Sequence, residues 1–219
     1  MDIVIFGGGN LASLAWYVLT HDSSHRVAGF TVDGDYCTGE GAHGLPMVPF
    51  EELEHHFPPD RFAMLLPLGG RNVNGLRADR YRAAKERGYG FISYVASGAL
   101  VWPDLQIGEN CMIFDGAIIN PFTVIGSNCI IRSGSLVSHH VVLGNHCFLA
   151  AHAVVGGNAK IGDRCFLGLN STVRDGISVA PRCFIAAGAV VTADTTENGI
   201  YMGVPARRRD TPADQWEAF

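Results

Sequence analysis

Two adjacent histidines, His139 and His140, are the side chains of this chain best suited by type to move a proton. An imidazole changes protonation near neutral pH, so it can act as a general base toward an amine or a hydroxyl group. Eighteen residues after His139 stands Gly157, preceded by Gly156, and such a pair exposes backbone N–H groups that can hold an oxyanion. A base and N–H donors together suit the transfer of an acyl group. The simpler alternative is a polar corner and a tight turn, both facing water.

A second set of candidates follows the first expected strand. Residues 2–6 form a short buried strand and residues 11–19 a helix-like run, with Gly8, Gly9 and Asn10 between them. Glycines let the backbone approach a ligand, and the free N–H groups at a helix start can bind phosphate. Strand, glycine loop and helix open a Rossmann-like unit, although glycine-rich turns also simply join strands to helices.

Two further candidates end later strands of the same domain. Asp33 follows the strand at residues 26–32, a position that often contacts a ribose or base, although it could also be a turn aspartate. Arg71 follows the buried strand at residues 62–68, at the edge where open α/β sheets bind ligands. The basic residues of the next helix are expected on a solvated face: Arg77, Arg80, Arg82 and Lys85.

The histidine pair lies inside a strict repeat of six residues. Every sixth residue is aliphatic and branched: Val95, Val101, Ile107, Ile113, Ile119, Ile125, Ile131, Val137, Leu143, Leu149, Val155, Ile161, Leu167, Val173, Val179, Ile185 and Val191. Neither the period of a strand nor that of a helix produces a period of six. Three such hexads make a triangular coil, and these coils stack as parallel strands around one continuous core. The small residue four places after each aliphatic residue is expected to point inward as well.

Five of the six cysteines share one phase of the eighteen-residue coil. They are Cys111, Cys129, Cys147, Cys165 and Cys183. Stacked inward thiols are expected to pack as small apolar groups, without disulfides, and no Cys-x-x-Cys pair is present for zinc. His146 and His152 continue from His140 in steps of six, which turn to successive faces. Three histidines therefore do not converge in one subunit, and a zinc site would need a trimer to bring them together.

Composition and charge narrow the classes of partner that the chain is expected to bind. The chain of 219 residues has a net charge of −5, which gives no electrostatic basis for binding nucleic acid or an anionic membrane surface. The apolar run at residues 11–19 is too short to span a bilayer, and no basic leader precedes it. A cytoplasmic protein is therefore expected. We expect two domains, residues 1–92 and 93–219, packed rigidly because no flexible linker separates them.

The repeats that begin at Ile107, Ile125 and Ile161 resemble the hexapeptide repeats of left-handed parallel β-helix acyltransferases. With the α/β domain ahead of them, the whole chain is similar to the sugar-nucleotide acyltransferases, namely the bacillosamine and perosamine N-acetyltransferases and the sialic acid O-acetyltransferase-like group. The resemblance implies an α/β Rossmann-like domain that holds the nucleotide of a sugar nucleotide and does not bind NAD. It further implies an all-β left-handed parallel β-helix and a homotrimer with CoA slots between neighbouring prisms.

The resemblance also assigns roles around the histidines. His139 matches the general base of the family. His140 stands where the family usually has an acidic residue that orients this base. Another carboxylate such as Asp115, or a backbone carbonyl, would therefore have to orient His139. The first loop of the family often carries a histidine followed by a glycine, where this chain has Leu11 and Ala12.

Acetyl-CoA is expected along the coils. Gly157 matches the glycine whose N–H binds the acyl carbonyl, and Leu169 and Ala187 match positions whose backbone amides bind pantetheine. Arg207 belongs to a basic segment after the repeat that could meet the CoA phosphates or could be a solvated tail.

These features predict an acetyl-CoA-dependent acetyltransferase that needs no metal and acts on the amino group of a nucleotide-linked sugar, in the synthesis of bacterial surface polysaccharide. Transfer to a sugar hydroxyl is the nearest alternative. A zinc lyase resembling the γ-carbonic anhydrases, or a non-catalytic trimer that binds a sugar nucleotide, also stays open. The sequence does not distinguish UDP, dTDP and GDP, nor one sugar from another.

Overall fold

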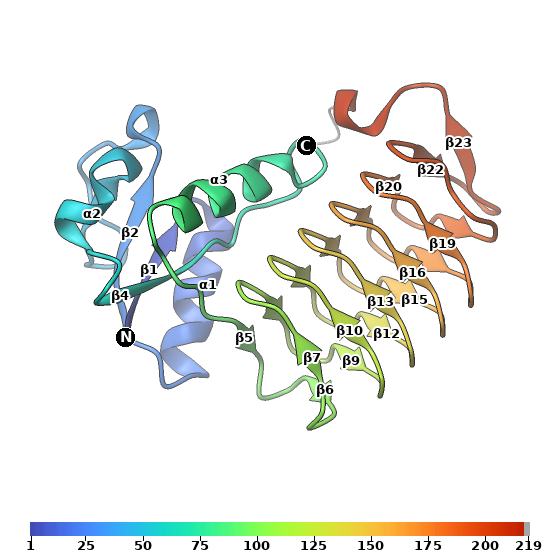
Figure 1. Cartoon of the computed structure of the whole chain (residues 1–219), viewed down its shortest axis with the longest axis horizontal. Helices are drawn as coiled ribbons and strands as arrows, with labels where there is room; N and C mark the ends of the chain where they lie inside the picture. Colours follow the sequence, from blue (N-terminus) through green and yellow to red (C-terminus); the bar gives the residue numbers. More distant parts are fainter. Residues whose placement is uncertain (217–219) are drawn as a thin grey trace.

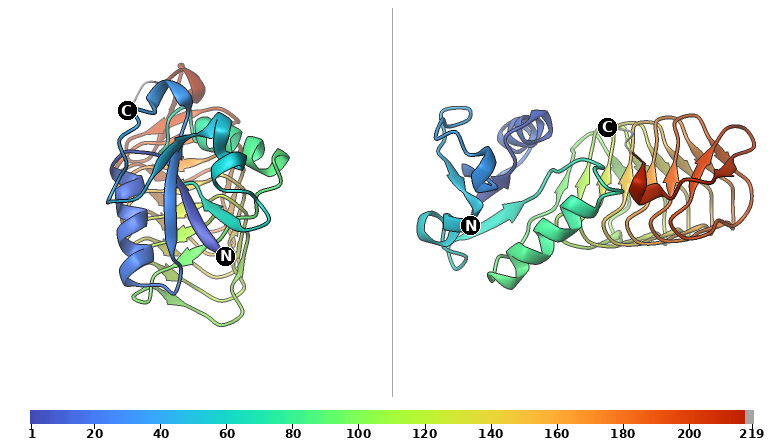
Figure 2. Two further views of the ribbon diagram at one scale, coloured as in Figure 1. Left: turned by 90° about the vertical axis from the view of Figure 1, so that its left-hand side faces the viewer. Right: turned by 90° about the horizontal axis from the view of Figure 1, so that it is seen from above.

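The computed structural model describes residues 1–216 and consists of a small α/β domain beside a prism of stacked coils (Figure 1). The views in Figure 2 place the α/β domain at one end of the prism, against one of its faces. The second predicted domain extends to residue 219, so its last three residues lie outside the described part. Within residues 1–216, no helix has both the length and the apolar character that crossing a membrane requires.

The first domain is built on a four-stranded parallel sheet with the order β3-β2-β1-β4. The strands are β1 (Asp2–Phe6), β2 (Val27–Val32), β3 (Met47–Pro49) and β4 (Phe62–Leu65). Continuous apolar runs such as the one in β1 are typical of parallel strands covered on both faces. Because β2 and β4 flank β1 on opposite sides, the strand order reverses there and leaves a crevice at the carboxyl ends.

Short helices connect these strands. They are α1 (Asn10–His21), the 3₁₀ turn η1 (Gly34–Tyr36), the 3₁₀ turn η2 (Phe50–Glu52) with α2 (Leu53–His56), and α3 (Gly75–Glu86). Helix α1 buries Ala12, Ala15 and Leu19, which lie three, four and seven residues apart and so share one face. The last described turn is η3 (Ala213–Gln215).

Two-residue strands form the three faces of the prism. The packed face, which adjoins the first domain, carries β5 (Tyr94–Val95), β8 (Met112–Ile113), β11 (Ile130–Ile131), β14 (Phe148–Leu149), β17 (Phe166–Leu167), β20 (Phe184–Ile185), β22 (Ile200–Met202) and the antiparallel β23 (Arg207–Arg209). The second face carries β6 (Leu100–Val101), β9 (Ile118–Ile119), β12 (Leu136–Val137), β15 (Val154–Val155), β18 (Thr172–Val173) and β21 (Val190–Val191). The third face carries β7 (Gln106–Ile107), β10 (Val124–Ile125), β13 (Val142–Leu143), β16 (Lys160–Ile161) and β19 (Ser178–Val179).

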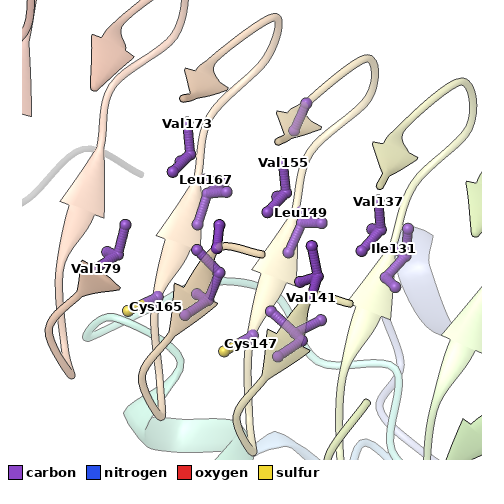
Figure 3. Close-up of a cluster of buried hydrophobic side chains, with 14 of the residues drawn as sticks. Ile131, Val137, Val141, Cys147, Leu149, Val155, Cys165, Leu167, Val173 and Val179 are labelled. Carbon is purple, nitrogen blue, oxygen red and sulfur yellow. The ribbon is translucent and has the colours of Figure 1, made fainter. Parts of the chain in front are cut away.

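The predicted stacking is confirmed by the strand register. Each residue pairs with the one eighteen positions further on, as Ile131 does with Leu149 and Leu149 with Leu167. Figure 3 shows these side chains, together with Cys147 and Cys165, directed into the prism. The thiols are free and buried. The core is therefore a column of small thiols and branched aliphatic groups that repeats once per coil.

Three columns of corners join the faces. The first corner joins the packed face to the second face and comprises residues 114–117, 132–135, 150–153, 168–171 and 186–189. The second corner joins the second face to the third face and comprises residues 120–123, 138–141, 156–159 and 174–177. The third corner joins the third face to the packed face and comprises residues 108–111, 126–129, 144–147, 162–165 and 180–183. At each of these corners the chain turns through one residue with a positive φ, for example His140 at 58° and Asn158 at 59°.

Outward apolar side chains attach the first domain to the packed face. They form one buried cluster with residues of β1 and α1: Met112, Ile130, Phe148, Phe166 and Phe184 on the prism, and Ile3, Ala15 and Leu19 on the domain. Because this cluster runs through both parts, the sheet of the first domain is held at a fixed place along the prism.

The expectation that Arg77 lies on a solvated face is wrong, because its side chain is fully buried between α3 and the third corner. Its guanidinium donates to the carbonyl oxygens of Leu68 at 2.8 Å, Asn128 at 3.2 Å, His146 at 2.9 Å and Cys147 at 3.0 Å. Burial lowers the pKa of Arg77 to about 10, so it stays charged at neutral pH. One cation thus ties the loop after β4 to successive coils.

Candidate active site

The histidine pair lies at the second corner, where β12 leads into β13. Nδ1 of His139 is 3.1 Å from Nδ1 of His140, and both rings are exposed. One of these two nitrogens must donate and the other accept, so they cannot both carry a proton in this contact. When His139 donates, its Nε2 is an unprotonated acceptor, and among the described residues this nitrogen has no hydrogen-bond partner. The contact therefore leaves His139 with an unoccupied acceptor nitrogen at an exposed corner, which is what a general base requires.

The backbone and a neighbouring ring position His140. Its φ of 58° belongs to the corner turn, and its ring centroid is 4.7 Å from that of Phe122, eighteen residues earlier. Asp115, considered from the sequence as the group that orients His139, lies at the first corner, where a Cβ on Gly98 would come within 2.8 Å of its Oδ1. Within one chain, His140 is therefore the polar side chain bonded to His139.

Gly157 lies directly beside the His139 ring. A Cβ added at Gly157 would stand 2.7 Å from Cε1 of that ring, so any larger residue here would force the His139 ring to move. The N–H of Gly157 donates to Oδ1 of Asp175 at 2.8 Å. That N–H is therefore already used in a hydrogen bond within the chain. What Gly157 provides to His139 is space, because glycine places no side chain beside the ring.

A cleft of about 910 Å³ opens at the carboxyl ends of the parallel strands. The predicted residues Gly8, Gly9, Asp33 and Arg71 all line it, whereas Asn10 begins α1 and is not part of the lining. The cleft thus lies in the crevice where doubly wound sheets bind nucleotides.

The charges of this cleft include a residue that the sequence analysis assigned elsewhere. Arg80 of α3 lines the cleft and pairs with Asp33 at 2.8 Å, so it does not lie on the solvated face expected for it. Glu51 accepts a hydrogen bond from the N–H of Gly34 at 3.0 Å and also lines the cleft. A helical spacing alone could not identify Arg80, because its partner Asp33 follows β2 in a distant part of the sequence.

Leu169 and Ala187 lie on the first corner, one coil apart, and both line a second cavity of about 570 Å³. No hydrogen bond within residues 1–216 takes up the backbone N–H of either residue. Leu169 is 53% exposed, so an extended ligand can reach these N–H groups. Arg207 lies in β23 at the far end of the prism, where it is exposed.

The candidate residues form two groups within one chain. His139 and Gly157 share the second corner, whereas the two cavities lie on the first domain, the packed face and the first corner, and neither histidine lines them. No group of three or more His, Cys, Asp or Glu side chains among residues 1–216 is arranged to hold a metal ion.

The coils match sequence models of hexapeptide repeats. The bacterial transferase hexapeptide model (six repeats) matches residues 104–139 and 140–173, and the hexapeptide repeat of succinyl-transferase matches residues 158–193. No curated protein sequence matches the chain closely enough to indicate a relative.

Solved structures match nearly the whole chain. PerB from Caulobacter crescentus, in complex with CoA and GDP-perosamine, is 26% identical over 95% of this chain and 97% of its own, with a TM-score of 0.86. The chain is an acyltransferase whose coils match hexapeptide repeats. Two variants of the GDP-perosamine N-acetyltransferase, with one histidine replaced by alanine or asparagine, match this acyltransferase with a TM-score of 0.88 each.

More distant structures support the fold of the acyltransferase. The acetyltransferase domain of PglB from Neisseria gonorrhoeae is 20% identical over 95% of this chain and 99% of its own, with a TM-score of 0.84. WeeI from Acinetobacter baumannii is 19% identical over 95% of this chain and 100% of its own, with a TM-score of 0.74. The coils of this acyltransferase form a left-handed parallel β-helix behind an α/β domain, as the sequence predicted.

Proposed function

We propose that this acyltransferase moves an acetyl group from acetyl-CoA to the amino group of a nucleotide-linked sugar. The observation that carries the proposal is the His139 imidazole, held at Nδ1 by His140 and without a partner at Nε2 among the described residues. The similarity to a CoA- and GDP-perosamine-bound N-acetyltransferase supports the substrate classes. A cytoplasmic place in the synthesis of surface polysaccharide belongs to the same proposal.

The chemical step follows from the position of the base. The sugar nitrogen attacks the thioester carbonyl carbon, a C–N bond forms, and Nε2 of His139 takes the proton that the nitrogen loses. The C–S bond then breaks, and the protonated histidine returns the proton to the departing sulfur. Atoms and charge balance, because the products are an amide and the thiol of CoA.

The first domain supplies the nucleotide site in this proposal. Gly8 and Gly9 let the diphosphate approach the start of α1, and Arg71 adds a positive charge at the same edge. The pair of Asp33 with Arg80 is placed to contact the ribose or the base. Asn10 takes part only through the helix N-terminus that it begins.

A homotrimer completes the site. The outward residues of the second and third faces include exposed apolar side chains, namely Leu100, Ile118, Val124 and Val142. Such a surface on a soluble protein is typical of an interface. If prisms pack around a threefold axis, the second corner of one subunit meets the first corner of its neighbour. The N–H groups of Leu169 and Ala187 then lie on later coils of that first corner, where pantetheine can extend along them from His139.

The deciding experiment follows CoA release from acetyl-CoA with a thiol reagent, against amino sugars linked to UDP, dTDP and GDP and their hydroxy counterparts. We expect release with one amino sugar, and loss of that release in His139→Ala. Release with hydroxy sugars only would instead identify an O-acetyltransferase. Nucleotide binding without release from any acceptor, in folded trimeric protein, would overturn the proposal in favour of a non-catalytic binding protein.

A further inference from the structure

The second cavity lies between the first domain and the packed face. Leu11, Gly69 and Gly70 contribute its domain side, and Phe148, Ala150 and Ala151 are among the coil residues opposite. Its wall is mostly apolar, unlike the charged cleft in the first domain. No role has been given to this cavity beyond the two backbone positions at its rim.

One loop forms the edge of both cavities. Leu68 and Arg71 line the nucleotide cleft, and the two residues between them, Gly69 and Gly70, line the second cavity. Gly70 has little room, since a Cβ there would come within 2.6 Å of the Phe166 ring, whereas a Cβ on Gly69 would make only an ordinary contact with Leu11 at 3.6 Å. A ligand whose nucleoside occupies the cleft can therefore continue past this loop into the apolar cavity.

Among residues 1–216, Arg132 is the one charged side chain that lines the second cavity. Its Cζ lies 4.4 Å from the centroid of the Phe114 ring, and its Nη1 is buried without a hydrogen-bond partner. Among residues 1–216, no carboxylate forms an ion pair with it. Burial lowers the pKa of Arg132 from its ordinary value, because it disfavours the charged form of the guanidinium. The guanidinium is therefore a cation at the wall of the cavity, with which an oxyanion on a ligand can pair.

The place of Arg132 in the coil links the cavity to the chemistry. Arg132 and His139 belong to the same coil, at the first and second corners respectively. In a threefold assembly with parallel prism axes, equal coils of neighbouring subunits are level. Arg132 of one subunit then lies on the same level as His139 of the next, two and three coils before the rim residues Leu169 and Ala187.

We propose that the second cavity is the acceptor-sugar subsite, and that Arg132 binds an oxyanion carried by the acceptor. The ring of Phe148 and the small residues opposite it receive the apolar face of the sugar. The oxyanion is either a carboxylate on the sugar or the phosphate joined to it, which present the same charged oxygens to a guanidinium. This inference rests on the proposed function and deepens it, because it names the residue that selects the acceptor.

The test compares Arg132→Met and Arg132→Lys with wild type, using the acceptor that supports CoA release. We expect Arg132→Met to raise KM for the acceptor by about 10- to 100-fold, the loss of one charged hydrogen bond, with KM for acetyl-CoA unchanged. Arg132→Lys keeps the charge and should recover part of the affinity. Arg182→Met is the matched control, because Arg182 pairs with Glu197 at the third corner, away from both cavities. It should leave both KM values unchanged.

Binding of the free nucleoside diphosphate distinguishes the two sources of the oxyanion. If Arg132→Met weakens that binding, the phosphate is the partner; if only a nucleotide-linked uronic acid loses affinity, the partner is the sugar carboxylate. An unchanged KM for the acceptor in folded Arg132→Met and Arg132→Gln would overturn the inference while the proposed function stands. No CoA release by wild type with any acceptor would instead remove the proposed function, and this inference with it.

Discussion

At the scale of single residues, the Nδ1–Nδ1 contact determines how His139 can work. His140 is an acceptor for His139 only while it is neutral, and it brings no negative charge to stabilise a protonated His139. A carboxylate at that position would accept the hydrogen bond from His139 and would also stabilise the protonated form of His139. In the proposed mechanism, His140 therefore orients the base without adding charge to it.

Replacement of His139 should separate chemistry from folding. We expect His139→Ala to lower kcat by about 10²- to 10⁴-fold, because a positioned base is lost, while an exposed ring leaves the fold unaffected. CoA release and thermal unfolding, measured on the same preparation, check both halves. Activity near that of wild type would exclude His139 as the base.

His140 should behave as a positioning residue. His140→Ala removes the acceptor for His139 Nδ1, and we expect kcat to fall about tenfold, equal to one hydrogen bond of about 1.4 kcal/mol. His140→Asp should restore the rate and change its pH profile, because the carboxylate favours a protonated His139. Equal rates in all three proteins would mean that the contact has no function.

Gly157 offers a test of the space beside the base. Gly157→Ala places a methyl group 2.7 Å from Cε1 of His139, so the ring must shift. We expect kcat to fall by up to about 10²-fold with little change in KM for the sugar nucleotide, since misplacement of a reacting group by about 1 Å costs that much. Gly156 is not a usable control, because a Cβ there would stand 2.3 Å from Asp175. Ala153→Gly, a substitution in the prism core, is the control. It measures how much kcat changes when the replaced residue does not contact His139.

At the scale of elements, the seam between α3 and the third corner holds the two domains in one arrangement. Arg77→Leu would leave several buried carbonyl groups without a donor, each costing about 1–3 kcal/mol, so we expect stability to fall by at least about 3 kcal/mol. Arg82→Ala, on the same helix and mostly exposed, should change it by less than about 0.5 kcal/mol. Urea unfolding of both variants measures the difference, and similar losses would contradict a special role for Arg77.

The same seam contains a group that responds to pH. Burial and the nearby Arg77 charge lower the pKa of His146 to about 4, from about 6.5 in an unfolded chain. Between these values the unfolded chain binds a proton that the folded chain does not, so stability decreases as pH falls from about 6.5 to about 4. His146→Asn keeps an acceptor for Asn128 and suits the left-handed φ of 61°, so it should flatten this dependence.

How much the sequence could reveal also depends on the element. The period of six predicted the coil stack, because every aliphatic rung points into a prism that only such a period can fill. It could not reveal Arg77, because a charged helix face looks solvated until the packing of two domains is known. The bond between Gly157 and Asp175 was detectable, since Asn145 and Asp163 show the same spacing of eighteen and the same contact.

At the scale of the whole molecule, the separation of the histidine corner from both cavities predicts sites shared between subunits. His139→Ala and Arg71→Glu should each be nearly inactive alone. In trimers assembled from equal amounts of both, we expect about a quarter of wild-type activity, because one interface in four joins two intact halves. Activity no greater than that of the separate variants would show that each subunit works alone.

The strand register has one more consequence, for how the protein can change in length. Because each coil repeats the one before it, removing or adding eighteen residues would leave every face and corner in phase, whereas a change of six would turn the remaining coils to the wrong face. The distance from the histidine corner to the far end of the prism can therefore vary only in whole coils of roughly 4.8 Å. The length of prism along which a CoA arm can extend therefore changes only in steps of one coil.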